Sequence, residues 1–390
     1  MDTIEIFAGG GGLLLGGALA GVKHIGAVEW NHWACETMRV NSSDSNSVIF
    51  GLPVFESDVR AVDWATALGN SSEVDIVSGG PPCQPFSLGG LARSADDPRD
   101  MFPAMAEVIS VLKPKAFVVE NVKGLTRKSF TDYLEFIKLR LTFPEIHSKP
   151  GELWREHYVR LQKESTASTY SGLRYNLVAK VVDAADYGVP QRRHRIFIVG
   201  FRSDLGIEWS PPEATHSANA LSYSQHRGDY WERHKVSEKL RFPIKKKVLE
   251  DGLLPWQTVR DALHDLPEPE PEGTHLWLNH KLQLGAKIYP GHTGSPLDEP
   301  SKALKAGNHG VPGGENMIRF PEGHVRYYSV REAARIQTFP DDYALHGAWG
   351  EAMRQLGNAV PVKLAEVVMS SVREQLVAVS SNVKQPKIKK

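Results

Sequence analysis

The chain has 390 residues, of which 41% are hydrophobic, the composition of an ordinary globular protein. Its formal net charge of +0 argues against a uniformly basic nucleic-acid binder, so any DNA affinity must come from local placement of Arg and Lys. Two cysteines, Cys35 and Cys83, exclude a disulfide framework and a zinc cluster. We find no secretory signal and no apolar stretch long enough to span a bilayer, so we expect no membrane contact and a cytoplasmic location.

Short apolar runs alternate with helical patterns over the first half of the chain. This alternation predicts βαβ units and an α/β fold with a doubly wound, mostly parallel sheet. The expected strands are 4–7, 26–29, 76–78, 117–120 and 196–201, and the expected helices are 13–20, 32–40, 105–112 and 130–141.

The second half is less regular. A polar stretch at 144–171 is interpreted as a surface insertion, and after residue 201 frequent Pro, Gly, His and Trp indicate a smaller, irregular domain. Ser329 and Glu332 predict a capping box that starts a helix, and an apolar stripe over 362–379 predicts a closing helix on the first domain. The expected division is 1–200, 201–325 and 326–380, followed by a basic tail at 381–390.

Polar or glycine residues lie at the ends of the first two expected strands and at the end of a third segment, at Asp58. Four glycines at 9–12 let a ligand approach the backbone, although a tight turn without a ligand also fits. Glu29 is placed to bind ribose hydroxyls and Trp30 to stack on a purine; the alternatives are a solvated acid and a core indole. Asp58 accepts from an exocyclic amine or caps a turn. Three such sites together favour a ligand more than any one of them.

Cys83 stands in a loop just past the strand at 76–78, between Pro82 and Pro85. Free cysteines are usually buried and inert, but a core position would not be framed by two prolines and polar residues. We therefore interpret Cys83 as a nucleophile at a strand end, where ligands collect in α/β sheets. Cys35, inside a helical pattern, is assigned to packing.

Charged residues also lie at the ends of two later strands. Glu120 ends an apolar strand, where burial would raise the pKa of its carboxyl; a surface acid is the alternative. Arg193 and Arg195 are expected on one face because strand side chains repeat every two residues, and two guanidiniums suit a planar carbonyl and phosphates. An exposed basic edge is the alternative.

Together these residues resemble the DNA (cytosine-5)-methyltransferase family, of the type found in bacterial modification enzymes. The resemblance covers about 4–200 and 326–379, in the family's order. The matching runs are 7–12 (cofactor motif), 80–84 (nucleophile motif), 120–122 (Glu-Asn-Val), Gln191 with Arg193 and Arg195, 331–340 and 355–361.

The resemblance implies a Rossmann-like S-adenosylmethionine-dependent methyltransferase that acts on C5 of cytosine in a specific double-stranded DNA sequence. Cys83 would attack C6 of a flipped-out base, Glu120 would contact N3 and the amino group, and Arg195, supported by Arg193, would hold O2. The implied DNA contacts are Gln84, Ser87 and Arg99, in a lid at about 84–102. The implied cofactor residues are Phe7, Ala8, Gly9, Gly10, Gly12, Glu29, Trp30, Asp58, Val59, Pro82, Asn358 and Val360.

Two positions depart from the family pattern: Glu5 replaces an Asp, and Asp100 replaces a glycine after the loop arginine. The expected assembly is a monomer on DNA, with a cognate restriction endonuclease left open. An RNA cytosine-5 methyltransferase is an alternative, but the long variable region favours groove reading in a DNA duplex. A non-catalytic relative is disfavoured because Cys83 and Glu120 are both present.

Overall fold

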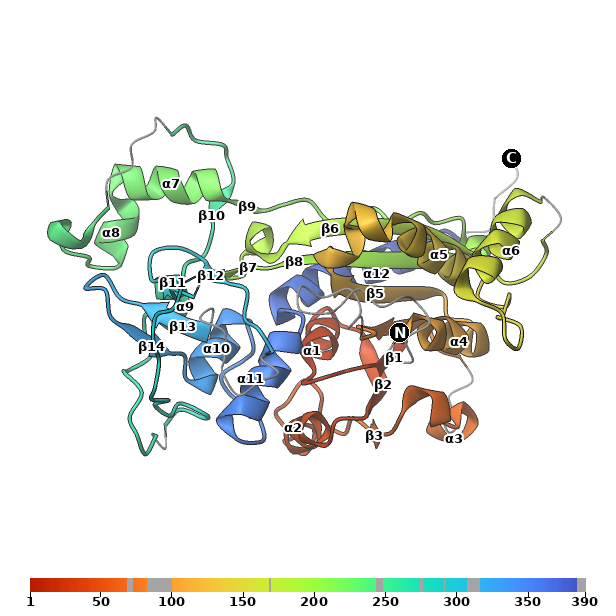
Figure 1. Ribbon diagram of the computed structural model, residues 1–390, viewed down its shortest axis with the longest axis horizontal. Coiled ribbons are helices and arrows are strands. Elements are labelled where there is room, and N and C mark those ends of the chain that lie inside the picture. The colour runs from red at the N-terminus through yellow and green to blue at the C-terminus, as the bar shows by residue number, and fades with distance from the viewer. Residues whose placement is uncertain are drawn as a thin grey trace.

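A seven-stranded sheet forms the larger lobe of the computed structural model, in the order β3-β2-β1-β4-β5-β8-β6 (Figure 1). The structure describes residues 1–68, 73–82, 100–167, 170–242, 248–273, 276–290, 292–306 and 316–383. The strands of this sheet are β1 (Asp2–Ile6), β2 (Lys23–Glu29), β3 (Val54–Glu56), β4 (Ile76–Gly79), β5 (Ala116–Val122), β6 (Tyr175–Asp183) and β8 (His194–Arg202).

The strand directions decide where the site lies. β1 to β5 run parallel, whereas β8 is antiparallel to both of its neighbours, β5 and β6. The chain winds from β1 outward to β3 and then returns to β4, so the topological switch point lies between β1 and β4. Because β8 runs backwards, its first residues lie at the carboxyl edge of the others: Arg195 is paired with Val122. That edge faces the second lobe (Figure 1).

Helices cover both faces of the sheet, which explains why its strands read as continuous apolar runs. On one face Ile4 and Val77 pack with Met105 and Ile109, and on the other Val118 packs with Leu364. The helices of this lobe are α1 (Gly12–Leu19), α2 (His32–Ser42), α3 (Trp64–Leu68), α4 (Phe102–Leu112), α5 (Thr131–Thr142), α6 (Trp154–Thr166) and α12 (Val362–Val383).

The closing helix α12 is confirmed, and it packs against α1. Leu364, Val368 and Val372 of the predicted stripe are buried in the core that includes Leu13. A Cβ at Gly16 would lie 2.3 Å from the Cβ of Ala365, so the two helices are too close for a side chain there. The end of the chain thus completes the layer begun at its start.

The polar stretch at 144–171 contains α6, which the sequence analysis did not predict. Trp154 packs edge-on against Tyr133 of α5 at 5.4 Å and against Phe136 at 5.6 Å, and Leu161 is fully buried. This stretch is therefore an amphipathic layer over α5. Its mean polarity hid a narrow aromatic face.

The second lobe is built from short elements joined in small sheets, β10-β9, β11-β13-β14 and β12-β7. The capping box of α10 is confirmed: Ser329 Oγ accepts from the Glu332 amide, and the Glu332 carboxylate accepts from the Ser329 amide. Its elements are β7 (Gln191–Arg192), β9 (His216–Ser217), α7 (Ala218–Arg227), α8 (Asp229–Arg233), β10 (Leu254–Pro255), α9 (Val259–Leu263), β11 (Ser295–Pro296), β12 (Ser301–Lys302), β13 (Met317–Arg319), β14 (Val325–Tyr327), α10 (Val330–Ile336) and α11 (Trp349–Asn358). Single 3-10 turns lie at Val59–Ala61, Lys123–Thr126, Lys128–Phe130, Ala184–Tyr187, Ser203–Leu205 and Glu238–Leu240.

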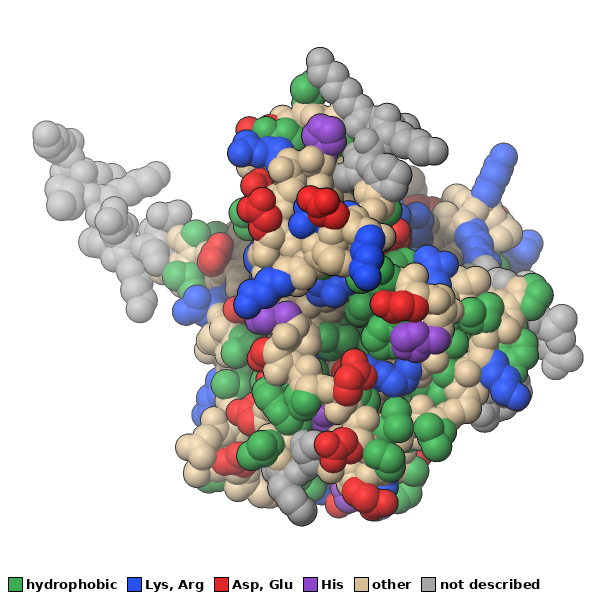
Figure 2. All heavy atoms as spheres, turned by 90° about the vertical axis from the view of Figure 1, so that its left-hand side faces the viewer, with side chains coloured by type: hydrophobic (Ala, Val, Ile, Leu, Met, Phe, Trp, Pro, Cys, Tyr) green, Lys and Arg blue, Asp and Glu red, His purple; other side chains and the backbone are tan. Residues whose placement is uncertain are grey.

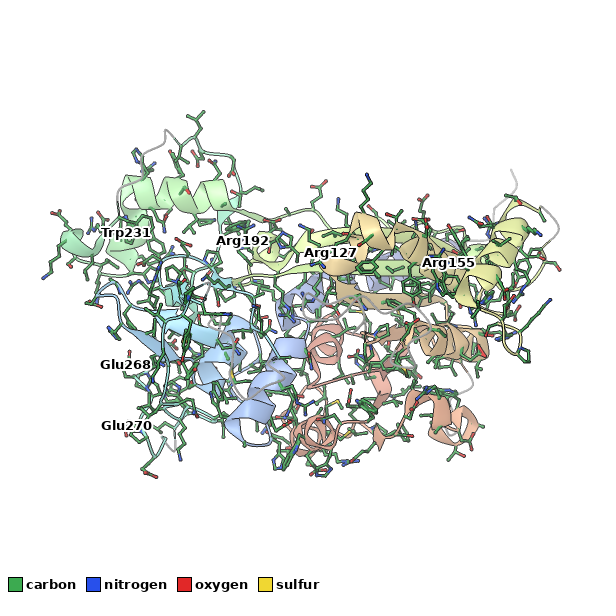
Figure 3. All side chains as sticks on the ribbon, in the orientation of Figure 1. Arg127, Arg155, Arg192, Trp231, Glu268 and Glu270 are labelled. Atoms are coloured by element: carbon green, nitrogen blue, oxygen red, sulfur yellow. The ribbon has the colours of Figure 1, made fainter. Side chains whose placement is uncertain are left out.

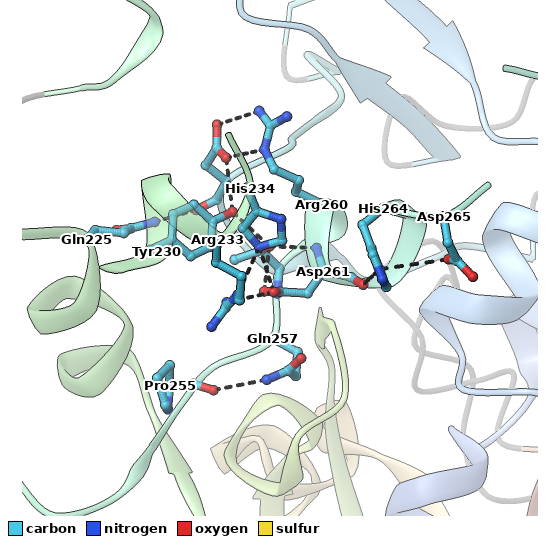
Figure 4. Close-up of polar contacts among 12 residues, drawn as sticks. Gln225, Tyr230, Arg233, His234, Pro255, Gln257, Arg260, Asp261, His264 and Asp265 are labelled. Carbon is cyan, nitrogen blue, oxygen red and sulfur yellow. Dashed lines mark hydrogen bonds and ion pairs between the residues drawn. The ribbon is translucent and has the colours of Figure 1, made fainter. Parts of the chain in front are cut away.

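A buried polar network joins α8 to α9 (Figure 4). The Tyr230 hydroxyl lies 2.9 Å from both Thr258 Oγ1 and Asp298 Oδ1, and Arg260 Nε lies 2.6 Å from the same Asp298 oxygen. Asp261 pairs with His234 at 2.8 Å. The apolar cluster here has only a few residues, so the hydrogen bonds of this network help to hold α8 against α9.

The two lobes meet at Arg192, which Figure 3 labels at their junction. Its guanidinium stacks over the Trp256 ring at 5.0 Å and its Nε lies 3.2 Å from Asp183 Oδ2. The chain leaves the sheet lobe only after Trp209, which is buried in the same core as α12. Acidic and basic side chains are interspersed over the outer face of the second lobe (Figure 2). In the described part of the chain, no helix combines the length and apolarity needed to cross a bilayer.

Candidate active site

The glycine turn between β1 and α1 has an unusual backbone. Phe7, Gly9 and Gly11 have φ angles of 55°, 53° and 86°, in the left-handed region that only glycine adopts freely. A Cβ at Gly9 would meet nothing within 4 Å, whereas one at Gly12 would lie 2.2 Å from the carbonyl oxygen of Val360. The turn is therefore open at Gly9 and packed against the chain's own backbone at Gly12. Ala8, between them, is buried.

Glu29 closes the open side of this turn. Its Oε2 accepts a hydrogen bond from the Gly9 amide at 2.8 Å and its Oε1 one from the Asn31 amide at 2.8 Å. Burial raises the pKa of the Glu29 carboxyl, and these two amides oppose the rise. The solvated-acid alternative is thus wrong, because the side chain is buried at the end of β2.

Trp30 extends beyond Glu29 into solvent with 73% of its surface exposed. The core alternative for this indole is therefore wrong. An exposed indole beside an open glycine turn is the arrangement that stacking on a flat ring requires.

Asp58 follows β3 and caps a short turn by accepting from the Arg60 amide at 2.9 Å. Its carboxylate also pairs with the Arg60 guanidinium, which lowers the pKa of Asp58. The turn-cap alternative is thus realised, with the carboxylate partly exposed. Val59 is buried beneath it. Pro82 follows β4, on the far side of the switch point, so the predicted groups line the carboxyl ends of β3, β2, β1 and β4 in order.

The last two predicted cofactor residues lie at the end of α11 and just beyond it. Asn358 is exposed at the end of that helix, whereas Val360 is 5% exposed and its carbonyl covers Gly12. Asn358 can present its amide to a ligand, and Val360 serves the core.

Glu120 and Arg195 form a buried pair at the carboxyl edge. Arg195 Nε lies 2.6 Å from Glu120 Oε1, in an ion pair that does not have the geometry of a well-directed hydrogen bond. Burial raises the pKa of Glu120, although Arg195 and Arg193 act against the rise. A Cβ at Gly80 would lie 3.1 Å from Glu120 Oε2, so a glycine admits the carboxylate beside the start of the nucleophile loop. The surface-acid alternative is therefore wrong.

Arg193 is 1% exposed and is held by backbone groups. Its Nη1 donates to the Leu304 carbonyl at 3.0 Å and its Nη2 to the Gly357 carbonyl at 2.6 Å. Its charge also acts on Glu120 and Arg195. Arg193 thus ties three distant segments together behind Arg195, and the exposed-edge alternative does not hold for either arginine.

Several residues at the site were not predicted from the sequence. Asn121 Nδ2 donates to the Pro81 carbonyl at 2.9 Å, which holds the backbone two residues before Cys83. Gln337 Nε2 donates to the Ala359 carbonyl at 3.1 Å, and Gln191 donates to Gln337 at 2.9 Å. Asn121, Gln191 and Gln337 fall inside the motif runs, but the sequence gives no sign of which partners they meet.

Cys83, Gln84, Ser87 and Arg99 lie outside the described residues. The flanking Asp100, where the family usually has glycine, is described: it accepts from the Phe102 amide at 3.2 Å and from the Tyr133 hydroxyl. Glu5, the other departure, is buried and accepts from Ser78 Oγ at 2.8 Å. Both substitutions thus have partners in the fold.

Cys35 is fully buried, and its thiol donates to the Glu29 carbonyl at 3.3 Å. Burial and the nearby Glu29 raise the pKa of this thiol to about 12. Its assignment to packing is confirmed, because such a thiol has almost no thiolate at neutral pH.

His32, Glu36 and Glu56 have ligand atoms within 4.8 Å of one another, but Arg39 Nη1 donates to both glutamates at 2.7 Å. The guanidinium already balances their charge, so this group carries no metal assignment.

Comparison with known proteins gives the class. The family model for C-5 cytosine-specific DNA methylase matches residues 1–143 and 155–374. The type II methyltransferase M.MthTI of Methanothermobacter thermautotrophicus is 30% identical over 404 residues, covering 96% of this chain and 98% of that protein. M.Eco47II of Escherichia coli is 31% identical over 379 residues, covering 95% and 78%.

Solved structures share the fold. S. pombe Dnmt2 methyltransferase superposes with a TM-score of 0.55 at 16% identity, over 96% of this chain and 99% of that one. Entamoeba histolytica methyltransferase EhMeth superposes with a TM-score of 0.53 at 12% identity, over 99% of each chain.

The chain therefore belongs to the C-5 cytosine-specific DNA methylase family and is a DNA (cytosine-5)-methyltransferase of the bacterial modification type. The expected α/β methyltransferase fold is confirmed. The family model leaves out 144–154 of the stretch interpreted as an insertion and matches from residue 155 onward, which includes most of α6.

Proposed function

We propose that the chain transfers a methyl group from S-adenosylmethionine to C5 of a cytosine flipped out of a specific double-stranded DNA sequence. The observation that carries this is the buried Glu120–Arg195 pair, which lies at the same sheet edge as the open glycine turn. The Glu120–Arg195 pair offers a proton and a guanidinium that can bind a carbonyl oxygen. The neighbouring glycine turn offers a binding site for a nucleoside.

The cofactor cradle fits S-adenosylmethionine by its chemistry. The open backbone at Gly9 admits a close approach, the Glu29 carboxylate accepts from ribose hydroxyls, and the exposed Trp30 stacks on adenine. Asp58 would accept from the adenine amine beside Val59, and the exposed Asn358 would also contact the ligand. S-adenosylmethionine, when bound, supplies the methyl group that C5 receives.

The protein's own groups account for activation of the ring. The Cys83 thiolate adds to C6, which makes C5 nucleophilic, and protonated Glu120 supports this step by donating to N3. Arg195 would hold O2 with its guanidinium, and Arg193 fixes the start of β8 from behind. After methyl transfer a base removes the C5 proton, N3 returns its proton to Glu120, the C5–C6 double bond re-forms, and Cys83 leaves as thiolate.

The reacting ring edge is inaccessible in a duplex, so the proposal requires base flipping. Gln84, Ser87 and Arg99 would contact the opened duplex. We assign sequence reading to residues 201–325, which supply most of the second lobe, and expect a monomer on DNA. A bacterial DNA substrate implies action in the cytoplasm, and a restriction endonuclease for the same site is the natural partner of a modification enzyme.

Bisulfite sequencing of DNA from cells that express the chain tests the proposal. We expect 5-methylcytosine at one short sequence motif in every copy, and none in cells that express Glu120→Ala. Methylation of RNA alone, or no methylated DNA, would refute it.

A further inference from the structure

A segment at 343–346, here called the strap, connects the second lobe with the glycine turn at 9–12. Its backbone is held by side chains on both sides. Asn41 of α2 makes two hydrogen bonds of 2.8 Å with the backbone of Ala344, and Asn279 makes bonds of 2.8 and 2.9 Å with that of Leu345. The next amide, of His346, donates to Thr37 Oγ1 at 2.8 Å. The strap is thus fixed at each residue.

The side chain of Tyr343, the first strap residue, points into the glycine turn. Its side chain is buried, and its hydroxyl donates to the Gly10 carbonyl at 3.0 Å. A Cβ at Gly11 would come within 2.7 Å of the same hydroxyl, so the turn and the phenol fit closely. Arg331 holds the Tyr343 carbonyl at 2.8 Å and the Leu278 carbonyl at 2.9 Å, which anchors the strap to the second lobe.

The glycine turn therefore has two supports. Glu29, at the end of β2, accepts from the Gly9 amide, and Tyr343, far along the chain, donates to the Gly10 carbonyl. Such support matters because Phe7, a non-glycine residue, is held at a φ of 55°. A residue in that region persists only where its surroundings over-determine it.

We infer that Tyr343 is a positioning residue for the cofactor: its hydroxyl holds the glycine turn in the shape that receives S-adenosylmethionine. This rests on the cofactor site proposed above. Nothing in the local sequence signals the role, because Tyr343 lies 333 residues from Gly10.

The test is Tyr343→Phe, which removes one hydroxyl and keeps the ring. The matched control is Tyr328→Phe, because Tyr328 is also fully buried and its hydroxyl bonds to Ser301 at 3.2 Å, away from the turn. Calorimetric titration with S-adenosylhomocysteine should show about three- to tenfold weaker binding for Tyr343→Phe and little change for Tyr328→Phe. At saturating cofactor, kcat should stay close to that of the wild type, while KM for S-adenosylmethionine rises.

Equal affinities in wild type and Tyr343→Phe would overturn the inference, as would an equal loss in both variants or a fall in kcat with KM unchanged. A wild type that binds no S-adenosylhomocysteine would instead refute the cofactor site itself. Gly11→Ala gives a second measurement: because its Cβ would press on the hydroxyl, its loss of affinity should be smaller in the Tyr343→Phe background. Strictly additive losses would contradict the contact.

Discussion

Arg195 Nε lies 2.6 Å from Glu120 Oε1, and this pair forms because β8 is antiparallel to β5. Arg195 is the second residue of its strand, Glu120 is near the end of its own, and only antiparallel pairing brings the two to one edge. A cation and an acid whose carboxyl pKa is raised by burial then share one buried site. That combination suits a ring whose carbonyl must be held while its nitrogen receives a proton.

Glu120 should set the alkaline limb of activity. Its pKa lies above the ordinary value, so the protonated form persists further toward neutrality, and kcat/KM should fall as the pH rises through that pKa. Glu120→Gln should lose about 100-fold or more in kcat, and the remaining rate should lack this decline. The pH–rate profiles of both proteins check this. Glu135→Gln, at a partly exposed acid of α5 that pairs with Lys138, is the control. An unchanged alkaline limb in Glu120→Gln would contradict the role.

The two arginines should fail differently. Arg195→Lys should lower kcat/KM by about tenfold or more with little loss of stability, because a lysine cannot reproduce the planar donor set. Arg193→Lys should lower the free energy of unfolding by about 1–3 kcal/mol, because one ammonium cannot reproduce the two bonds that the guanidinium makes to the Leu304 and Gly357 carbonyls. Urea unfolding and steady-state kinetics separate the effects. If Arg193→Lys were as stable as the wild type, its structural role would be refuted.

Trp30→Ala should weaken cofactor binding about two- to tenfold by removing a stacking partner. Its indole is 73% exposed, so the melting temperature should hardly change. Fluorescence or calorimetric titration measures the affinity, and Leu276→Ala, another exposed apolar truncation, is the control. An equal weakening of DNA binding in the absence of cofactor would argue against stacking.

Gly12→Ala should destabilise the fold by about 1–3 kcal/mol or more, because its Cβ would meet the Val360 carbonyl at 2.2 Å. Gly350→Ala, in α11 with open space around it, should be neutral or stabilising. Thermal unfolding of the two variants is the measurement. A Gly12→Ala protein as stable as Gly350→Ala would show that α1 and the 360 segment are not closely packed.

The buried strands of the sheet were predictable from the sequence. Apolar runs such as 117–120 are long, buried on both faces and bounded by turn residues, and they became strands. β6 was not predicted because it is an edge strand with several half-exposed residues, and β3 because it has only three residues. α6 was hidden by its polar outer face. Edge and surface elements follow tertiary packing more than their own pattern.

The site was predictable where polar residues stand directly at the ends of predicted strands. Glu29, Trp30 and Glu120 lie at the sheet edge, as their positions at the ends of strands indicated. Arg195 precedes the expected strand 196–201 and reaches the same edge only because β8 is antiparallel to β5. Tyr343 was not predictable, because its role depends on a contact that closes only when the whole chain has folded. Arg193, whose guanidinium binds the distant Leu304 and Gly357 carbonyls, shows the same limit.

The most direct test of the account is to trap the enzyme on DNA. Duplexes that carry 5-fluorocytosine at the methylated position keep the adduct from resolving, since the fluorine cannot leave as the proton does. In the presence of S-adenosylmethionine we predict a covalent complex whose mapped crosslink is Cys83, retained in Cys35→Ala and absent in Cys83→Ala. A crosslink at another side chain, or a complex that survives Cys83→Ala, would contradict the mechanism.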